Sequence, residues 1–297
     1  MIRDVQSSPL VWEPSSGVII LCVKVSPELI ALATPLCPYH EVYICPDRPD
    51  SKHPPRPAKP YEPGVIVVDA RECVASGWYG SVSFMPRAAS SRCKALRWLS
   101  LRLGEAGRLN HWWMLEEDVF IPTEFTLLRM DRIYGRPASE LTRAKRAAKW
   151  AEGTPSAAKV SGSEVDLICP HHFVRTGSSG PFDLGHWSGE RRWNHWRWAR
   201  NMGVPLPWAS SLVCGIRVSM RLVEEIARFV DQYHRLLFCE LIFNTVAEQR
   251  GLRVVVAREM MTIVWKVRSW EGVSILPTCL YHPMKRLRQH INLRGNV

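Results

Sequence analysis

At 297 residues, with 46% hydrophobic and 23% charged residues, the chain has the composition of a soluble globular protein that can bury a sizeable core. It contains no run of eighteen apolar residues and no signal-peptide core near its start, so we expect neither a transmembrane helix nor a secretion signal in it. The formal net charge of +11 favours an acidic partner, such as a nucleic acid, an anionic membrane surface or a phosphorylated substrate.

The first hundred residues alternate apolar strands with helical segments. A proline-rich stretch at 46–63 interrupts them and predicts an extended loop. The alternation of strand, helix and strand favours a parallel sheet. We expect strands at 17–24, 40–45 and 64–69, and helices at 27–36 and 92–103.

Residues 112–122 are the most informative stretch: Trp-Trp-Met-Leu-Glu-Glu-Asp-Val-Phe-Ile-Pro. Apolar residues on both sides of three carboxylates predict a strand at 112–121 that is buried on both faces. Glu116, Glu117 and Asp118 then lie toward its C-terminal end, where ligands bind in open α/β sheets. Adjacent carboxylates are costly to bury without a cation, so we expect a divalent metal that carries substrate phosphates. In an extended strand, Glu116 and Asp118 would point to one side and Glu117 to the other.

The second half continues the alternation less regularly. Residues 136–163 are basic and weakly patterned, which predicts an exposed helix and a mobile loop, and 175–190 reads as a loop. We expect a helix from Pro122 to near Gly135, strands at 165–169 and 253–257, and helices at 218–229 and 236–250. The whole pattern favours one α/β domain.

Nine cysteines are present, without a Cys-x-x-Cys pair. Their odd number and irregular spacing predict neither a zinc site nor a particular disulfide. Four of them lie in apolar stretches and are expected to be buried thiols: Cys22, Cys169, Cys214 and Cys239. Cysteine usage leaves the compartment open. We expect a cytoplasmic location for the chain as it stands, and a location in the Golgi or secretory lumen if an N-terminal anchor is missing from it.

The acidic strand and the strands before it resemble nucleotide-sugar glycosyltransferases of the GT-A type. Those enzymes hold Mn²⁺ or Mg²⁺ on the donor diphosphate with an Asp-x-Asp motif at a strand end. The resemblance implies a Rossmann-like GT-A fold, with a mostly parallel central sheet flanked by helices. It implies an N-terminal extension at 1–16 and a single domain at 17–290. Within that domain, 17–135 is the nucleotide-sugar and metal half, 136–163 an exposed basic linker and 164–290 the acceptor half.

The resemblance also implies roles for individual residues. Asp118 and Glu116 would be metal ligands, and Glu117 would contact the ribose or make a structural contact. Glu240, on a late helix, would be the base that deprotonates the acceptor hydroxyl, which fits an inverting transferase. His282 and Lys285, near the C-terminus, would return to the metal and the diphosphate. The Glu-Glu-Asp sequence departs from Asp-x-Asp, so the assignment of ligands within it stays open.

Other candidates have ordinary alternatives. Asp69 could contact the nucleotide, or it could cap a helix. Trp187, Trp193 and Trp208 could form a platform for sugar rings, or they could belong to the core. Glu240 could be a solvent-facing or ion-paired residue, and His282 an ordinary turn residue before a proline.

The predicted function is a metal-dependent transfer of a sugar from a nucleotide-diphosphate donor to an acceptor hydroxyl. The acceptor can be a glycan, a protein or a small molecule, and nucleic acid is not the expected partner. Two other activities stay open. The basic tryptophan-rich segment 187–208 could bind nucleic acid, although no known nucleic-acid motif is visible. The carboxylates could instead serve a phosphodiesterase or nuclease. A GT-A-like fold that only binds its ligand is a further possibility.

Overall fold

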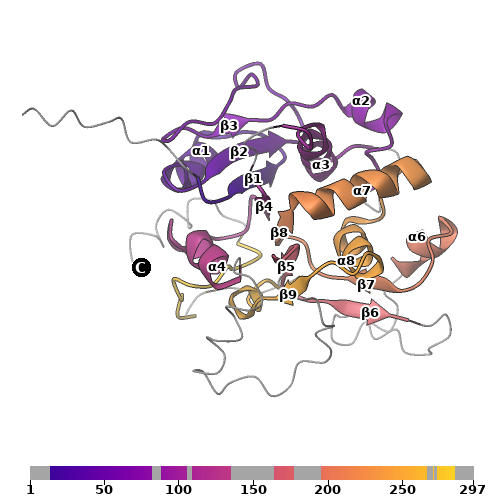
Figure 1. The fold of residues 1–297 in the computed structure, drawn as a ribbon. Helices are drawn as coiled ribbons and strands as arrows, with labels where there is room; N and C mark the ends of the chain where they lie inside the picture. The colour runs from indigo at the N-terminus through magenta and orange to yellow at the C-terminus, as the bar shows by residue number, and fades with distance from the viewer. Residues whose placement is uncertain are drawn as a thin grey trace, which may run out of the picture.

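A seven-stranded sheet forms the centre of the protein, in the order β3-β2-β1-β4-β8-β5-β9 (Figure 1). It is seen in a computed structural model that describes residues 14–81, 88–105, 109–134, 164–176, 195–265, 270 and 273–284. The strands, in sheet order, are β3 (Gly64–Val65), β2 (Glu41–Pro46), β1 (Gly17–Cys22), β4 (His111–Glu116), β8 (Gly215–Ser219), β5 (Leu167–Cys169) and β9 (Val254–Val256).

The sheet is mostly parallel. Strand β1 pairs in parallel with β2 and with β4, so that Ile19 lies opposite both Tyr43 and Met114. Only β8 runs antiparallel to its two neighbours, β4 and β5. Every residue of β1 is buried, as expected for a central parallel strand covered on both faces.

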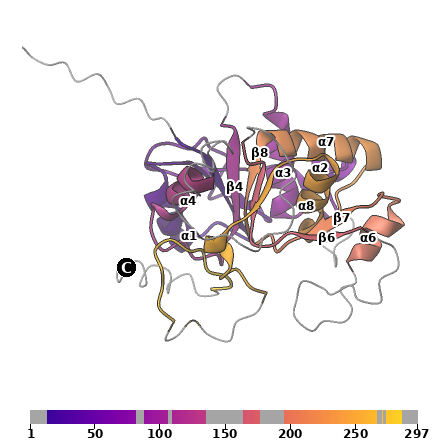
Figure 2. The same cartoon turned by 60° about the horizontal axis from the view of Figure 1, so that its bottom comes forward.

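Helices cover both faces of the sheet (Figures 1 and 2). Residues that alternate along the strands pack into two separate cores, so Ile19 and Met114 face one core while Val18 and Trp113 face the other. The first core lies under α3 (Ser91–Leu101), α7 (Met220–Tyr233) and α8 (Cys239–Gln249). The second lies under α1 (Pro27–Ala33) and α4 (Thr126–Tyr134).

Smaller elements surround this framework. Helix α2 (Ala70–Ala75) packs beside α3, and the 3₁₀ helix η1 (Thr34–Leu36) continues α1. A two-stranded antiparallel sheet pairs β6 (Phe173–Arg175) with β7 (Trp208–Ser210) and lies next to α6 (Trp196–Asn201) at one side of the molecule (Figures 1 and 2). A second 3₁₀ helix, η2 (Arg258–Met260), follows β9.

A buried ion pair joins the sheet to α4. Arg217 Nε in β8 lies 2.7 Å from Asp131 Oδ1 in α4. The Asp131 carboxylate also accepts hydrogen bonds from Ser16 Oγ at 2.7 Å and Trp113 Nε1 at 3.2 Å. The start of β1 and the middle of β4 and of β8 are therefore held together by one polar cluster.

The observed α/β architecture confirms the predicted fold class, while several element boundaries differ. Strand β8 was not predicted: its residues fell partly within the helix expected at 218–229, which begins at Met220. The strand expected at 64–69 pairs only at Gly64–Val65. The acidic strand ends at Glu116 instead of continuing to 121. The linker at 136–163 and most of the loop at 175–190 lie outside the described residues.

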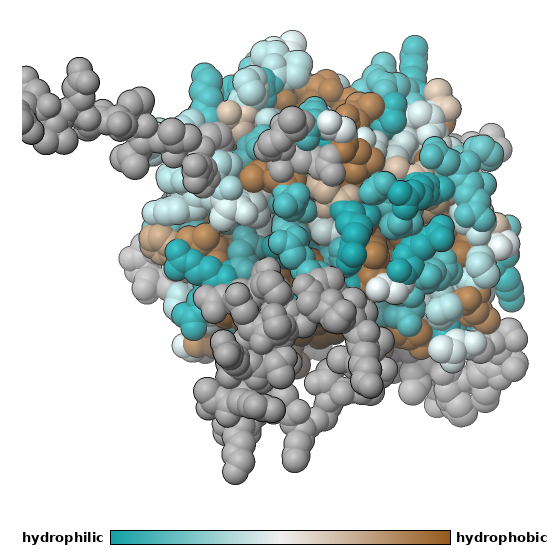
Figure 3. Space-filling model, in the orientation of Figure 1, coloured by the Kyte–Doolittle hydropathy of each residue, from teal (hydrophilic) through white to brown (hydrophobic). Residues whose placement is uncertain are grey.

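All nine cysteines are free thiols, and seven of them are buried. Among the helices that the structure describes, none combines the length and the hydropathy needed to cross a bilayer. On the face seen in Figure 3, hydrophobic residues occur in small areas between hydrophilic ones. This mixed surface is usual for a folded protein whose large apolar side chains fill internal cores.

Candidate functional site

A cleft of about 480 Å³ lies at the C-terminal ends of β1 and β4. After β1 the chain turns to β2 and β3 on one side, and it then returns to form β4 on the other side. Such a reversal leaves a crevice between the two strand ends, where open α/β sheets bind ligands. The cleft is lined by Leu21, Cys22, Val23, Asp47, Ser81, Ser90, Ser91, Arg92, Glu116, Glu117, Asp118, Cys239 and Met284.

The three acidic residues form a turn at the end of β4. Val119 N donates to Glu116 O at 2.9 Å, which closes the turn. The turn is held on both sides, because Glu117 N donates to Leu21 O at 2.9 Å and Glu116 N to Cys214 O at 2.7 Å. Since the strand has already ended, the expected alternation fails: Glu117 lines the same cleft as its two neighbours instead of facing away from it.

The segment at 281–284 returns along this turn and carries His282 into it. Phe120 N donates to Tyr281 O, and Met284 N donates to Asp118 O, both at 2.8 Å. His282 is 4% exposed, and its Nδ1 lies 2.9 Å from Val264 O. A carbonyl only accepts, so Nδ1 carries the proton, and in a neutral ring Nε2 presents its lone pair. That Nε2 lies 3.3 Å from Asp118 Oδ1 and 3.7 Å from Glu116 Oε2.

This arrangement fits a bound cation. When the ring is neutral, its lone pair and the two carboxylates repel one another, and a divalent ion between them removes that repulsion. Cys214 belongs to the same group: one donor atom each from Glu116, Cys214 and His282 lies within 4.8 Å of the other two. Burial, and then the charge of Glu116, raise the pKa of the Cys214 thiol well above its usual range.

Arg92, in the first turn of α3, adds a buried cation to the cleft. Its Nη2 donates to Glu116 Oε1 at 2.8 Å, and the residue is 5% exposed. Burial alone would lower the pKa of Arg92, but Cys239 and then Glu116 raise it above its ordinary value. Within the part of the chain that is described, Arg92 Nη1 has no hydrogen-bond partner. A buried donor of this kind favours an anionic ligand oxygen in the cleft.

The backbone around the start of α3 is fixed by Asp47, which follows β2. The Asp47 carboxylate accepts a hydrogen bond from Ser91 N, and Asp47 O accepts one from Lys94 Nζ at 2.6 Å. Lys94 is 3% exposed. These contacts hold the positive end of the helix dipole at the cleft, where it favours bound anions.

Glu240 lies in the first turn of α8 and is 7% exposed. Its neighbour Cys239 lines the cleft, and Ser211 N donates to Glu240 O at 3.0 Å. The Glu240 charge contributes to the raised pKa values of both Arg92 and Cys214. Glu240 is therefore buried within electrostatic reach of the acidic turn, and not on a solvent-facing side of the helix.

Other candidate residues lie elsewhere. Asp69 caps α2 by accepting a hydrogen bond from Arg71 N at 2.7 Å, and it does not line the cleft. Trp208 is 7% exposed, belongs to the core beside Trp196 and donates from Nε1 to Val204 O at 3.0 Å. It too is absent from the cleft lining. Trp187, Trp193 and Lys285 lie outside the described residues.

Three of the residues gathered here were not predicted from the sequence to lie at this site. Asp47 follows a predicted strand, and Arg92 begins a predicted helix. Ligands in open α/β sheets bind where strands end and the next helices begin, so both positions could have been proposed for the edge of the cleft. Cys214 precedes a strand that was not predicted, so no local pattern indicated that its thiol would lie at the acidic turn.

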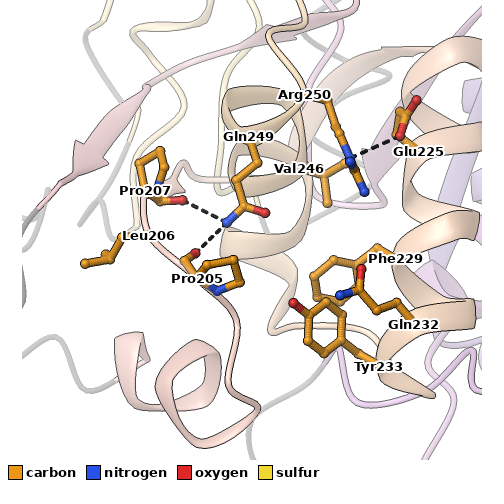
Figure 4. Close-up of a pocket in the computed structure, with 10 residues that line it drawn as sticks. All are labelled: Pro205, Leu206, Pro207, Glu225, Phe229, Gln232, Tyr233, Val246, Gln249 and Arg250. Atoms are coloured by element: carbon orange, nitrogen blue, oxygen red, sulfur yellow. Dashed lines mark hydrogen bonds and ion pairs between the residues drawn. The ribbon is translucent and has the colours of Figure 1, made fainter.

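A second cavity, of about 330 Å³, lies between α7, α8 and the loop at 205–207 (Figure 4). Its polar groups bond mainly to one another. Gln249 Nε2 donates to Pro205 O at 2.6 Å and to Pro207 O at 3.0 Å, and Arg250 Nε lies 3.2 Å from Glu225 Oε2. Unlike the cleft at the acidic turn, this cavity has no grouped metal donors among the described residues.

Comparison with protein families finds no match, and comparison with curated proteins finds none either. Among solved structures, the chain is similar to the galactosyltransferase LgtC in complex with donor and acceptor sugar analogs. The TM-score is 0.43 and the identity 9%, over 95% of this chain and 96% of that chain. An active-site mutant of LgtC is similar with a TM-score of 0.42 and 9% identity, over 95% of each chain. Similarity at this level assigns no activity to the present chain.

Proposed function

We propose that the protein is a metal-dependent glycosyltransferase that takes a sugar from a nucleotide-diphosphate donor. One observation carries the proposal. Glu116 and Asp118 line a cleft at the point where the strand order reverses, beside the partly unpaired guanidinium of Arg92, and the buried His282 Nε2 lies 3.7 Å and 3.3 Å from their carboxylates. Ligand atoms for a cation and a hydrogen-bond donor for an anion therefore lie close together, as the binding of a metal-diphosphate requires.

The residues divide into those that would hold a metal and those that would meet the donor. Asp118, Glu116 and His282 supply the oxygen and nitrogen donors for Mn²⁺ or Mg²⁺. The ion, when bound, would act as a Lewis acid that neutralises charge on the leaving diphosphate. Arg92 Nη1 and the start of α3 would bind diphosphate oxygens. Glu117, Asp47 and the end of β1 line the part of the cleft left for the nucleoside.

Glu240 is the proposed base for the acceptor hydroxyl. A buried carboxylate near the acidic turn can take a proton when the hydroxyl attacks the sugar. A single base of this kind fits a direct displacement, which inverts the anomeric carbon. The anomeric configuration of the product, read by NMR, tests this step. A retained configuration would remove the base role from Glu240.

Ligand-dependent stability tests the proposal directly. Purified protein is heated with a panel of nucleoside diphosphates and nucleotide sugars, each with Mn²⁺, with Mg²⁺ or with EDTA. A ligand at ~100 times its dissociation constant adds about 2.7 kcal/mol to the free energy of unfolding, a readable shift. We expect one nucleotide family to stabilise the protein only when metal is present. We then expect transfer from the matching nucleotide sugar.

A variant that carries both Glu116→Gln and Asp118→Asn is the control for the metal. Both changes keep side-chain shape, but Glu116→Gln removes the charge that Arg92 Nη2 contacts, so circular dichroism first checks that the variant is folded. The folded variant should lose metal-dependent nucleotide binding. Unchanged binding or transfer in this variant would contradict the proposal.

The two rival activities give different results in the same experiments. A nucleic-acid-binding protein would be stabilised by oligonucleotides in the presence of EDTA, with a steep dependence on salt. A phosphodiesterase would cleave phosphodiester substrates in a metal-dependent manner and would not need a sugar donor. No observed feature of the cleft favours either rival over the transferase.

A further inference from the structure

We propose that Cys214 is itself a metal ligand, so that the site prefers a thiophilic divalent ion such as Zn²⁺ or Co²⁺ over Mg²⁺. The inference rests on the metal site of the proposed function and names the kind of ion that the site takes.

The position of Cys214 is set by the acidic turn. Its carbonyl accepts the hydrogen bond of Glu116 N at 2.7 Å, so the backbone of Cys214 lies directly beside the first acidic residue. Its thiol shares one small space with a carboxylate oxygen of Glu116 and a ring nitrogen of His282, all within 4.8 Å of one another. The cysteine and the histidine are buried, with exposed fractions of 6% and 4%.

The ring of His282 is already oriented as a ligand. Because its Nδ1 is held by Val264 O, the proton stays on that nitrogen and Nε2 faces the acidic turn. A histidine that ligates a metal through Nε2 typically donates its other ring proton to a carbonyl or carboxylate. The backbone also fixes the residue, since Val264 N donates to His282 O at 3.2 Å. The cluster therefore has a preset nitrogen donor next to the thiol.

The chemistry of the donors determines the choice of ion. Oxygen donors alone suit Mg²⁺, Ca²⁺ and Mn²⁺, whereas imidazole and thiolate donors favour Zn²⁺ and related ions. One sulfur, one nitrogen and carboxylate oxygens form a set of the kind that binds Zn²⁺. On binding, the sulfur–metal bond forms as the thiol proton leaves to solvent.

Co²⁺ serves as the spectroscopic probe. Protein freed of metal with EDTA and dialysed is titrated with Co²⁺ alone and with a nucleoside diphosphate present. The wild-type protein should show a near-ultraviolet absorption band from charge transfer between thiolate and Co²⁺. Added Zn²⁺ should displace the Co²⁺, and excess Mg²⁺ should not. X-ray absorption of the Zn²⁺-loaded wild type should find one sulfur among the ligands.

Two substitutions separate Cys214 from the other thiols. Cys214→Ser should abolish the charge-transfer band and lower Zn²⁺ affinity about tenfold or more. Cys37→Ser is the matched control, because Cys37 is also buried, lies outside the group formed by Glu116, Cys214 and His282, and donates from its thiol to Ala33 O at 3.7 Å. It should leave the band unchanged. If Cys214→Ser does not fold, the X-ray absorption of the wild type still decides the question.

The outcomes distinguish this inference from the proposed function. Metal binding without sulfur ligation, with equal use of Mg²⁺ and Zn²⁺, would overturn the role of Cys214 and leave the transferase proposal standing. A wild-type protein that binds no divalent ion, with or without nucleotide, would overturn both.

Discussion

Arg92 Nη2 and Glu116 Oε1 lie 2.8 Å apart, yet the two side chains differ greatly in exposure: 6% for the arginine and 38% for the glutamate. The guanidinium is thus enclosed by protein, while the carboxylate extends into the cleft. One carboxylate oxygen contacts Arg92, and the other lies 3.7 Å from His282 Nε2. Glu116 therefore connects the proposed anion-binding side of the cleft with the proposed metal-binding side.

This relationship predicts the effect of replacing Arg92. Arg92→Met should weaken the binding of a nucleoside diphosphate by roughly tenfold to a hundredfold, because a hydrogen bond to a charged group contributes about 1.5–3 kcal/mol. Arg92→Lys should recover part of the affinity, since it keeps the charge but not the forked donors. Isothermal titration measures both. In Arg92→Met, the partly exposed Glu116 carboxylate can be hydrated in place of its contact with the guanidinium. The free energy of unfolding should therefore change by only about 0–1 kcal/mol. Equal affinity in all three proteins would remove Arg92 from the site.

The ion pair at the other end of the sheet should behave differently. Arg217 is 3% exposed, so Asp131→Asn leaves a buried charge without its partner. Breaking such a pair costs about 3–5 kcal/mol, whereas replacing both members with apolar residues is often close to neutral. We expect denaturant unfolding to show a large loss for Asp131→Asn and a much smaller one for Asp131→Leu combined with Arg217→Met. A double variant as unstable as the single one would mean that the pair itself contributes to stability.

The central sheet could be predicted in part because its parallel strands are buried on both faces. Such strands appear as continuous apolar runs, and β1 and β4 were recognised in this way. Strand β8 contains Arg217 and leads directly into α7, so it lacks both an uninterrupted apolar run and a turn that would separate it from the helix. The arginine is buried only because Asp131 meets it, and a contact between residues so far apart is not visible in a local pattern.

The location of the site could also be predicted from the sequence, but its detailed geometry could not. Adjacent carboxylates after an apolar run locate a cleft because sheet topology brings strand ends together. The turn after Glu116 depends on hydrogen bonds that its backbone N–H groups donate to the carbonyls of Leu21 and Cys214, which belong to distant segments. The direction of Glu117 and the presence of the Cys214 thiol follow from those contacts. Neither could be read from spacing.

Two buried histidines predict how stability depends on pH. Burial lowers the pKa of His40 and of His111 from 6.5 to about 4. Between those values the unfolded chain binds protons that the folded protein does not, so the free energy of unfolding falls as the pH decreases. Each histidine contributes a slope of up to about 1.4 kcal/mol per pH unit within this window. The stability that depends on both histidines being neutral is fully present above about pH 6.5.

Denaturant unfolding at several pH values between 7 and 4 measures this slope. His40→Asn keeps a polar group next to Ser16 Oγ, which lies 3.0 Å from His40 Nδ1. The His40→Asn variant should lose the part of the slope that one titrating histidine contributes, up to about 1.4 kcal/mol per pH unit, whatever the effect of the substitution on stability at pH 7. An unchanged slope in this variant would show that His40 titrates alike in the folded and unfolded states.

Two carboxylates on α8 allow the role of Glu240 to be tested within one helix. Glu240 is buried beside the cleft, whereas Glu248 lies two turns further on and contacts His172 Nε2 at 3.0 Å. If Glu240 takes the acceptor proton, Glu240→Gln should lower kcat by a factor of 10² or more while the affinity for the donor nucleotide stays near that of the wild type, since general-base catalysis contributes ~10²–10⁴-fold. Glu248→Gln should leave kcat close to normal, because its carboxylate is engaged with His172. Loss of donor affinity in Glu240→Gln would instead assign Glu240 to positioning Arg92, whose pKa its charge helps to raise. Comparing kcat with the dissociation constant of the donor nucleotide in both variants therefore separates catalysis by Glu240 from an electrostatic role.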